Sequence, residues 1–259
     1  MTRKPTFFSA EVNIKFIKKA LADALFPRDF TCDICGVETF DGNLCPQCKK
    51  AVHFNCGAVC PECGRRTARP EICLECKEKP PLFKRGYSAL VYDDGAQILI
   101  SKFKNGNGYL KEYFADLLAA KDLPETDGII FVPMTKKSER ARGYNQGKLL
   151  AKSLSERIGA PVLDAFEKIK ETKSQKALGF KERKNNLEGS FKVKDGATVK
   201  DKTLLLVDDV LTTGATAEEL TKIALRAGAK AVYLATVASV EYKIIKKENA
   251  SDLKKRKKI

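Results

Sequence analysis

Hydrophobic residues in the second half of the chain gather in short unbroken runs between polar stretches. Runs at 128–133, 204–207 and 231–237 each contain at least four apolar residues in succession. A strand of a parallel sheet is covered on both faces, so it reads as a continuous apolar run rather than an alternating one. Together with a strand predicted over 85–93, these runs predict the central parallel sheet of an α/β domain.

Helices are predicted between these strands. They cover 96–103, 109–120 and 217–227, and a further helix ends near Arg157. Strands that alternate with helices are typical of βαβ units, whose crossovers are right-handed. A turn at 104–108 separates the first two helices, since its Asn-Gly-Asn-Gly sequence favours turns.

The N-terminal segment has a different pattern. In residues 12–26 the apolar side chains fall on one helical face and most lysines lie elsewhere, and Pro27 ends the helix. A basic amphipathic helix can lie on a membrane surface. We favour a helix packed on its own protein, because the segment is short and its apolar side chains are mostly modest in size.

Residues 31–77 contain little apolar material and four Cys-x-x-Cys pairs. The gap between the first two pairs and the gap between the last two each hold nine residues. Two thiolates on a tight turn can ligate one ion, and a second pair completes a tetrahedron. The spacing predicts a zinc-ribbon module with one or two structural Zn²⁺ ions. The predicted ligands are Cys32, Cys35, Cys45, Cys48, Cys60, Cys63, Cys73 and Cys76.

The spacing leaves the grouping of these ligands open. Joining the first pair to the second and the third to the fourth is simplest, but an interleaved arrangement fits the same spacing. Cys56 and His53, the single histidine of the chain, could replace a ligand, although we expect them to be bystanders. Metal-free thiols are disfavoured, because so little apolar material would not fold without a metal. A four-cysteine site by itself does not distinguish nucleic-acid binding, protein binding and stabilisation.

Two adjacent carboxylates, Asp208 and Asp209, follow the strand at 204–207, and a loop that opens a helix comes next. Such a loop offers backbone N–H groups and the positive end of the helix dipole to a phosphate. Acids beside it would repel that phosphate unless the ligand also carries hydroxyls or a divalent cation, so a sugar phosphate fits both parts. The alternative, a capped helix with two solvated acids, is disfavoured by the full strand–acid–loop–helix order. The loop consists of Thr212, Thr213, Gly214, Ala215 and Thr216.

A strand, a basic loop and a helix follow one another in the same order after 128–133. We expect this loop to supply positive charge to the site. For any one of its cations, a solvated position is an equal alternative. The candidate residues are Thr135, Lys136, Lys137, Arg140, Arg142 and Asn145.

Charge and cysteine usage narrow the class of protein. Lys and Arg exceed Asp and Glu by 48 − 33 = +15, which favours polyanionic partners such as phosphorylated substrates or nucleic acid. With no apolar run of membrane-spanning length and no visible secretory signal, we expect a cytoplasmic protein without a membrane span. Paired cysteines in such a protein indicate metal rather than disulfides. The single histidine argues against a Ser/His/Asp catalytic set.

The acid pair and its loop resemble the phosphoribosyl pyrophosphate (PRPP) signature of type I phosphoribosyltransferases. The ordered set of motifs resembles the ComF/ComFC family of bacterial competence-associated phosphoribosyltransferase-like proteins over about residues 30–238. Lys176 and Phe54 depart from the pattern of that family. The motifs are the cysteine pairs, a Pro-Pro linker, Lys102-Phe103-Lys104, Val132-Pro133, Arg142-Gly-Tyr-Asn-Gln146, a set within 175–191 and the PRPP signature.

The resemblance implies an α/β, type I phosphoribosyltransferase-like domain with a central parallel sheet, preceded by a small zinc-ribbon module. It implies that Asp208 and Asp209 hold the ribose hydroxyls of PRPP, directly or through Mg²⁺, and that residues 212–216 hold the 5-phosphate. Thr135, Lys136 and Lys137 then lie on the pyrophosphate side, where Arg142 and Asn145 shape the site.

The implied function is transfer or binding of ribose 5-phosphate in association with DNA uptake, with the acceptor left open. Two alternatives are a PRPP-sensing domain without catalysis and a nucleic-acid-binding adaptor. Single-stranded DNA and other competence proteins are further candidate partners beside PRPP.

We expect four segments in the chain. A polar stretch at 170–191 is a candidate lid that excludes water. The basic C-terminal tail is favoured as a solvated end over a dedicated DNA contact. The segments are an N-terminal helix (1–30), the zinc-ribbon module (31–80), the phosphoribosyltransferase-like domain (84–240) and the tail (241–259), with a stiff linker at 77–84.

Overall fold

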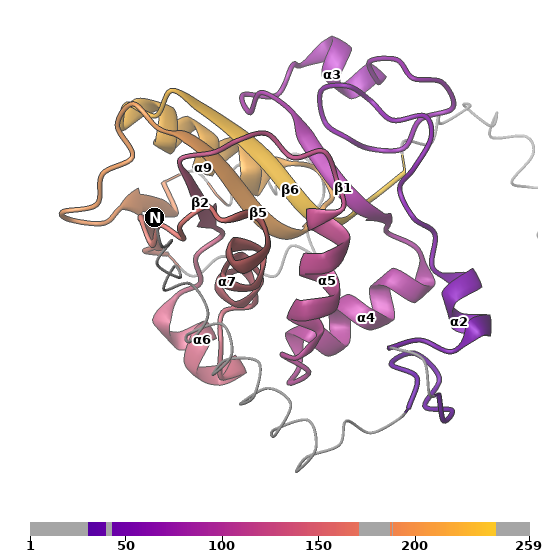
Figure 1. The fold of residues 1–259 in the computed structure, drawn as a ribbon. Helices are drawn as coiled ribbons and strands as arrows, with labels where there is room; N and C mark the ends of the chain where they lie inside the picture. The colour runs from indigo at the N-terminus through magenta and orange to yellow at the C-terminus, as the bar shows by residue number, and fades with distance from the viewer. Residues whose placement is uncertain (1–30, 40–42, 171–186, 188, 242–259) are drawn as a thin grey trace, which may run out of the picture. The chain divides into compact units, whose positions relative to one another are not determined.

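The computed structural model describes residues 31–39, 43–170, 187 and 189–241 (Figure 1). The chain divides into two compact units, Met1–Lys50 and Ala51–Ile259, and each is described by itself. The helix expected at 12–26 lies outside the described residues, as do nearly all of the candidate lid and of the basic tail. None of the helices in the described part of the chain has both the length and the apolar character needed to cross a membrane.

The second unit is built on a four-stranded parallel sheet, which confirms the fold class predicted from the apolar runs. The strand order is β1–β6–β5–β2. All three pairings are parallel, so the carboxyl ends of the strands meet at one edge of the sheet. The strands are β1 (Gly86–Val91), β2 (Gly128–Phe131), β5 (Thr203–Leu211) and β6 (Ala231–Ser239).

Strand β5 is longer than the apolar run that predicted it. Its pairing with β6 continues through Asp208, which lies opposite Thr236, to Leu211, which lies opposite Ser239. The ladder extends past the apolar run because β6 supplies backbone partners along this whole length. Asp208 and Asp209 therefore lie inside the strand, and the expectation that they follow it was wrong.

Helices cover both faces of this sheet (Figure 1). Helix α7 contacts β2 and β5, and α5 contacts β1, β6 and α7, whereas α9 packs against β6 and β4. Leu204 and Leu206 of β5 share a buried cluster with Leu220 of α9. The helix bounds are α4 (Asp94–Lys104), α5 (Leu110–Ala119), α6 (Lys136–Arg142), α7 (Gln146–Ile158) and α9 (Ala215–Arg226).

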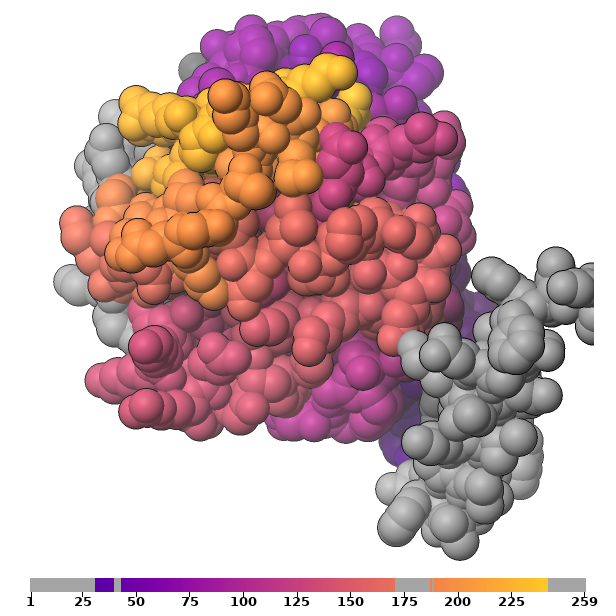
Figure 2. Space-filling model, turned by 60° about the vertical axis from the view of Figure 1, so that its left-hand side comes forward, coloured from indigo at the N-terminus to yellow at the C-terminus, as the bar shows by residue number. Residues whose placement is uncertain are grey.

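A small antiparallel pair lies beside the main sheet. It consists of β3 (Phe166–Lys168) and β4 (Phe191–Val193), with Phe166 opposite Val193. Figure 2 shows the orange segment that carries β4 against the salmon segment that carries β3. Strand β4 also contacts α9, and Phe166 and Phe191 share the buried cluster of Leu204, Leu206 and Leu220, so this pair packs on the same side of the sheet as α9.

The cysteine-rich region contributes to both units. Helix α2 (Pro46–Ala51) begins directly after Cys45, and α3 (Leu74–Glu78) contains Cys76. The linker that follows α3 is attached to the sheet, because the backbone N–H of Lys84 donates to the carbonyl of Val232 at 2.7 Å.

Candidate functional site

The carboxyl ends of β2 and β5 lie side by side. Pairing continues one residue beyond β2, where the N–H of Val132 donates to the carbonyl of Val207 at 3.3 Å. Asp208 and Asp209 follow Val207 directly, and Thr135 lies three residues beyond Val132. The acid pair, in the part of β5 that extends past β2, and the basic segment therefore lie at the same edge of the sheet, where ligands bind in open α/β folds.

Asp209 is buried and has two side-chain partners. Its Oδ2 atom lies 2.7 Å from Nζ of Lys104, the last residue of α4. Gln146 donates to the same oxygen from Nε2 at 3.3 Å, and its Oε1 accepts from Nη1 of Arg142 at 2.6 Å. A predicted residue of the basic segment is thus linked to the acid pair through one glutamine.

Asp208 is partly buried, and its carboxyl has a raised pKa. Burial raises the pKa of the Asp208 carboxyl to about 7, the charge of Asp209 adds to this rise, and Lys104 opposes it. Its Oδ1 atom accepts a hydrogen bond from the backbone N–H of Asp209 at 2.8 Å. Near neutral pH this carboxyl can therefore gain or lose a proton in response to a small change in local charge.

The loop between β5 and α9 has the expected geometry of a helix entrance. Gly214 is the N-cap of α9 and has a φ of 77°, a left-handed conformation that glycine adopts without strain. Ala215 N donates to Oγ1 of Thr213 at 3.4 Å. Because α9 begins at Ala215, two residues earlier than predicted, Ala215 and Thr216 belong to its first turn. The backbone N–H groups of that turn point out of the helix end.

The segment predicted as a basic loop contains the short helix α6. Thr135 caps this helix, since its Oγ1 accepts from the N–H of Ser138 at 3.1 Å, and Gly143 ends it with a φ of 86°. These two capping positions explain a helix that charge alone did not predict. Lys136 and Lys137 are exposed at its start, whereas Thr135 is buried.

The motif 142–146 holds neighbouring elements in place. The hydroxyl of Tyr144 donates to the carbonyl of Phe103 and accepts from the N–H of Gly106 at 3.1 Å. Asn145 is buried, caps α7 by accepting from the N–H of Lys148, and donates to the carbonyl of Val132 at 3.2 Å. The motif thus holds the end of α4 and the end of β2 against the start of α7.

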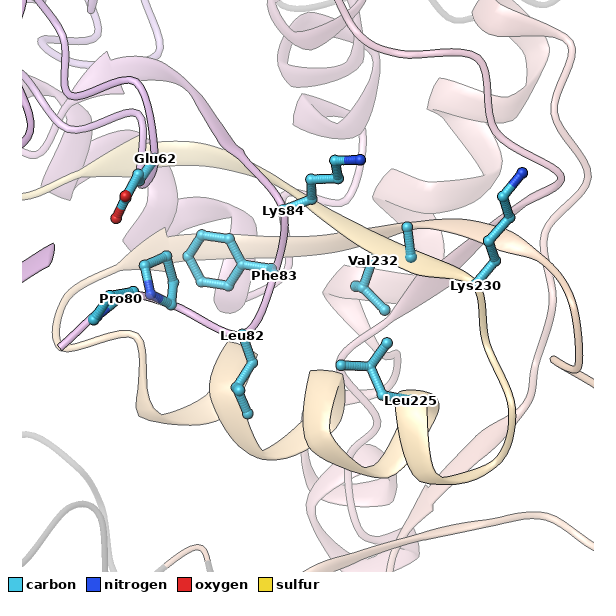
Figure 3. A pocket seen from close by; sticks show the side chains of 10 residues that line it. Glu62, Pro80, Leu82, Phe83, Lys84, Leu225, Lys230 and Val232 are labelled. Carbon is cyan, nitrogen blue, oxygen red and sulfur yellow. The ribbon is translucent and has the colours of Figure 1, made fainter.

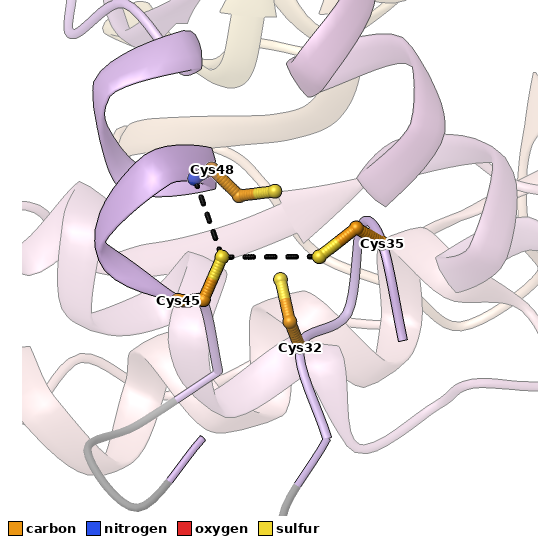
Figure 4. Close-up of side chains that lie close together, drawn as sticks. All are labelled: Cys32, Cys35, Cys45 and Cys48. Carbon is orange, nitrogen blue, oxygen red and sulfur yellow. Dashed lines mark hydrogen bonds between the residues drawn. The ribbon is translucent and has the colours of Figure 1, made fainter. Parts of the chain in front are cut away.

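The eight paired cysteines form two groups of four. In each group the four sulfur atoms lie within 4.8 Å of one another. Figure 4 shows the first group, in which Sγ of Cys35 lies 3.8 Å from Sγ of Cys45. The grouping is sequential, so the interleaved alternative was wrong. The groups are Cys32, Cys35, Cys45 and Cys48, and Cys60, Cys63, Cys73 and Cys76.

Comparison with known proteins gives matches along most of the chain. A double zinc ribbon domain model matches residues 21–77, and a phosphoribosyl transferase domain model matches residues 142–258. The DNA utilization protein YhgH of Salmonella typhi is 30% identical over 200 residues, which are 73% of this chain and 87% of that protein. Competence protein F of Haemophilus influenzae is 29% identical over 79% of this chain and 94% of its own length.

The chain belongs to the ComF family. A third relative, competence protein ComFC of Bacillus subtilis, is 26% identical over 76% of this chain and 83% of its own. Among solved structures, orotate phosphoribosyltransferase from Aeropyrum pernix aligns with 65% of this chain and 74% of its own at 18% identity, with a TM-score of 0.32. The fold assignment therefore rests on the family models and on the strand topology rather than on superposition.

Both cysteine groups of this ComF-family chain fit Zn²⁺. Four sulfur ligands without an open position are typical of structural zinc. Burial raises the pKa of both Cys48 and Cys63 to about 12, and neighbouring thiols add to the rise. Without a cation Cys48 and Cys63 would therefore keep their protons at neutral pH, whereas a bound metal ion would replace them. Outside the two groups, Cys56 is exposed and Nδ1 of His53 lies 2.7 Å from Oδ2 of Asp93.

The structure also contains a cavity of about 310 Å³ at the opposite edge of the sheet (Figure 3). It is lined by Phe83, Leu225 and Val232 among others, and Val232 is the second residue of β6. The cavity therefore lies at the amino ends of the strands, away from Asp208 and Asp209. It does not belong to the candidate site.

Sequence reasoning missed the contacts that organise the edge. Lys104, Tyr144 and Gln146 were noted only as parts of family motifs, yet Lys104 and Gln146 contact Asp209, and Tyr144 bonds the carbonyl of Phe103, the residue before Lys104. The one sequence feature that these residues share, and that could have indicated a role at the site, is a position in a polar motif beside a predicted turn or loop. The partners could not be read from the sequence, because Lys104 and Asp209 are more than a hundred residues apart.

Proposed function

We propose that this ComF-family protein binds PRPP together with Mg²⁺ at the carboxyl edge of its sheet and transfers ribose 5-phosphate to an acceptor. The observation that carries the proposal is the chain of contacts from Arg142 through Gln146 to Asp209, beside the loop at 212–216. It places the basic segment and the acid pair at one edge, next to the loop that opens α9. PRPP needs all three, because it carries a pyrophosphate, ribose hydroxyls and a 5-phosphate.

In this proposal the acid pair binds the ribose. The carboxylates of Asp208 and Asp209 accept hydrogen bonds from the ribose hydroxyls, either directly or through the ion. A proton on Asp208 weakens this binding, so ligand binding favours its ionised form. Lys104 neutralises Asp209 before the ligand arrives.

The loop takes the terminal phosphate. Residues 212–216 surround it with hydroxyls and with the N–H groups of the first turn of α9. Gly214 supplies the left-handed backbone (φ 77°) that turns the chain into α9, a conformation that residues with a side chain rarely adopt. The positive end of the helix dipole adds to the attraction.

The segment 135–142 takes the pyrophosphate. Lys136 and Lys137 are exposed at the start of α6, where their ammonium groups supply positive charge to the ligand. Thr135 and Asn145 cap the helices α6 and α7, and in this way they fix the position of the segment. Arg142 is held by Gln146 and lies between the two halves of the site.

Transfer proceeds at the anomeric carbon. The bond from this carbon to the pyrophosphate oxygen breaks, the electron pair leaves with pyrophosphate, and a lone pair of the acceptor forms the new bond. Asp208 and Asp209 stabilise the positive charge that develops on the ribose ring. Mg²⁺, when bound, stabilises the charge on the leaving pyrophosphate. No side chain has to act as a nucleophile.

A second candidate function is that of a nucleic-acid-binding adaptor without catalysis. It is favoured by the net charge of +15 and by the names of the relatives, which refer to DNA utilization and competence. Binding to single-stranded DNA would weaken steeply with salt, whereas PRPP binding would depend on Mg²⁺ and on the acid pair. The two candidates are compatible in one chain.

Calorimetric titration with PRPP and Mg²⁺ tests the proposed function. The double variant Asp208→Asn/Asp209→Asn should lose PRPP binding by at least about 100-fold, because two charged acceptors are removed without a change of shape. Asp195→Asn, the same substitution at an exposed aspartate beyond β4, is the matched control and should bind as the wild type does. Equal PRPP affinity in the double variant and the wild type would refute the assignment.

A further inference from the structure

The side chain of Arg65 joins the second cysteine group to the loop proposed for the 5-phosphate. Arg65 is only 3% exposed. Its Nη1 atom donates to Oε2 of Glu75, and its Nη2 atom donates to the backbone carbonyl of Thr212, the first residue of the loop. A buried guanidinium that bonds a specific carbonyl fixes the direction of that peptide group.

The position of Arg65 is set by the cysteine group itself. Arg65 follows Cys63 by two residues, and its own carbonyl accepts from the N–H of Cys60 at 2.8 Å. Its partner Glu75 lies between Cys73 and Cys76, in the opposite half of the same group. An ion bound by the four sulfurs would therefore hold Arg65 and Glu75 at a fixed separation.

The same module is packed backbone to backbone against the sheet. A Cβ atom on Gly64 would lie 2.2 Å from the carbonyl oxygen of Gly86, the first residue of β1. The N–H of Gly86 donates to the carbonyl of Glu62 at 2.7 Å, and Asn55 donates to the carbonyl of Gly64 at 2.7 Å. Little freedom remains for Arg65 to move relative to the strands that carry the acid pair.

The chain after the cysteine group reaches the other side of the loop. The N–H of Leu82 donates to Oε1 of Glu218 at 3.0 Å, and Nζ of Lys79 lies 3.8 Å from Oε2 of the same residue. Glu218 is in the first turn of α9. Figure 3 shows Leu82 beside this helix. Arg65 and the linker after the second cysteine group thus contact the chain on either side of residues 213–216, at Thr212 and at Glu218.

We propose that Arg65 is a positioning residue through which the metal-loaded second cysteine group sets the conformation of the 5-phosphate loop. The inference rests on the proposed function. The C=O and N–H of a trans peptide point in opposite directions, so holding the carbonyl of Thr212 toward Arg65 turns the N–H of Thr213 away from the module. A phosphate is bound by such an N–H, whereas a rotated peptide would present a carbonyl oxygen that repels it.

The test compares ligands that use different parts of the site. Wild type, Arg65→Met, Arg65→Lys and Arg69→Met are titrated with PRPP and Mg²⁺, with ribose 5-phosphate, and with pyrophosphate and Mg²⁺. Arg65→Met removes the donors but fills similar space, and Arg69→Met removes an exposed arginine of the same module as a control. Zinc content is measured for each protein.

We expect Arg65→Met to weaken PRPP and ribose 5-phosphate about tenfold, the equivalent of one lost orienting hydrogen bond. Binding of pyrophosphate should stay within about twofold, because the partners of Arg65, Glu75 and the carbonyl of Thr212, lie outside the segment proposed for it. Arg65→Lys should restore part of the loss, and Arg69→Met should cause none. A general loss of structure would weaken all three ligands alike.

Two results would overturn the inference alone: unchanged ribose 5-phosphate binding in Arg65→Met at wild-type zinc content, or an equal loss for ribose 5-phosphate and pyrophosphate. A wild-type protein that binds neither PRPP nor ribose 5-phosphate would overturn the proposed function together with the inference.

If Arg65→Met does not fold, the rate of zinc extraction from the wild-type second cysteine group tests the same inference. Coupling between two sites is reciprocal, so saturating ribose 5-phosphate should slow the extraction of zinc from the second group by a chelator. The full chain with Cys32→Ser and Cys35→Ser removes the first group from this signal. Glu75→Gln, which leaves Arg65 in place but removes its anionic partner, should reduce the slowing. An extraction rate that ribose 5-phosphate leaves unchanged would contradict the coupling.

Discussion

The Nζ atom of Lys104 lies 2.7 Å from Oδ2 of Asp209 at the carboxyl edge of the sheet. The carboxylate is nearly covered, with its side chain 10% exposed, whereas that of Lys104 is 31% exposed. A buried carboxylate without a cation is costly, so this ion pair makes the acid pair compatible with a folded domain that holds no ligand.

Removal of Lys104 should therefore destabilise the protein. We expect Lys104→Met to lower the free energy of unfolding by about 1–3 kcal/mol at pH 7, because Asp209 is left buried without its cation. Urea unfolding measures this change. Lys102→Met, in the same motif, is the control and should cost less than about 0.5 kcal/mol.

A double variant separates the ion pair from packing. In Lys104→Met/Asp209→Asn the cost should be smaller than that of Lys104→Met alone, since no unpaired charge remains. Additive costs of the two substitutions would show that Lys104 stabilises the fold by contacts other than the one with Asp209.

Asp208 should make stability depend on pH. Its native pKa of about 7 lies above its usual value, so the folded state holds a proton that the unfolded state releases. The stabilisation from this proton is complete at a pH below the usual aspartate pKa and is lost as the pH rises to about 7. Asp208→Asn, which does not titrate, should therefore gain stability relative to the wild type between pH 5 and pH 8.

The measurement is urea unfolding of both proteins at the two pH values. The difference in the free energy of unfolding between Asp208→Asn and the wild type should change by at least about 1.4 kcal/mol from pH 5 to pH 8, the equivalent of one unit of pKa shift. Asp195→Asn controls for the loss of an exposed charge. A difference that is the same at pH 5 and pH 8 would mean that Asp208 titrates near its ordinary pKa.

The strands were predictable because their signal is local. A run such as 204–207 is buried on both faces, so its apolar residues are consecutive in the sequence. The end of β5 was not predictable, since Asp208 to Leu211 remain in the sheet only through pairing with β6. Helix α6 was missed for a different reason: its caps, Thr135 and Gly143, were assigned to a basic loop because charge was the more conspicuous pattern.

In the candidate site, too, the local features were predictable and the long-range contacts were not. The acid pair, the loop and the basic segment were found from their order in the chain, but the contacts between them join distant residues. Arg65 and Thr212 are separated by 147 positions, and Asp209 and Lys104 by more than a hundred. The spacing of the cysteine pairs likewise left their grouping open, which only the proximity of the sulfur atoms decides.

Tyr144 should matter through its hydroxyl group. In Tyr144→Phe the ring remains close to Phe103, at a centroid distance of 6.4 Å, but the carbonyl of Phe103 and the N–H of Gly106 lose their partner. We expect a loss of about 1 kcal/mol in the free energy of unfolding. Because these contacts hold the turn after α4, PRPP binding should weaken as Lys104 becomes less well placed.

Tyr109→Phe is the matched control, since its hydroxyl accepts from Nδ2 of Asn107 at 3.0 Å in the same exposed turn. Unfolding and PRPP titration are measured for both variants. Equal effects of the two substitutions would indicate a general sensitivity of this turn rather than a specific role for Tyr144.

Zinc content should follow the two cysteine groups independently. Elemental analysis of the wild type should find up to two zinc ions per chain, and the pair of substitutions Cys32→Ser and Cys45→Ser should remove one of them. The pair Cys60→Ser and Cys73→Ser should remove the other and also destabilise the sheet domain, because the second group belongs to the same compact unit as the sheet.

Loss of a structural zinc site typically abolishes the local fold, so the unfolding transition of the Cys60→Ser/Cys73→Ser variant should move by several degrees or more. Thermal unfolding followed by circular dichroism measures it, and restoring zinc to the buffer should not reverse the change. A protein that loses both ions when only the first group is altered would contradict separate four-sulfur sites. A sheet domain that unfolds at the wild-type temperature without the second group would show that Arg65 reaches Thr212 without help from the metal.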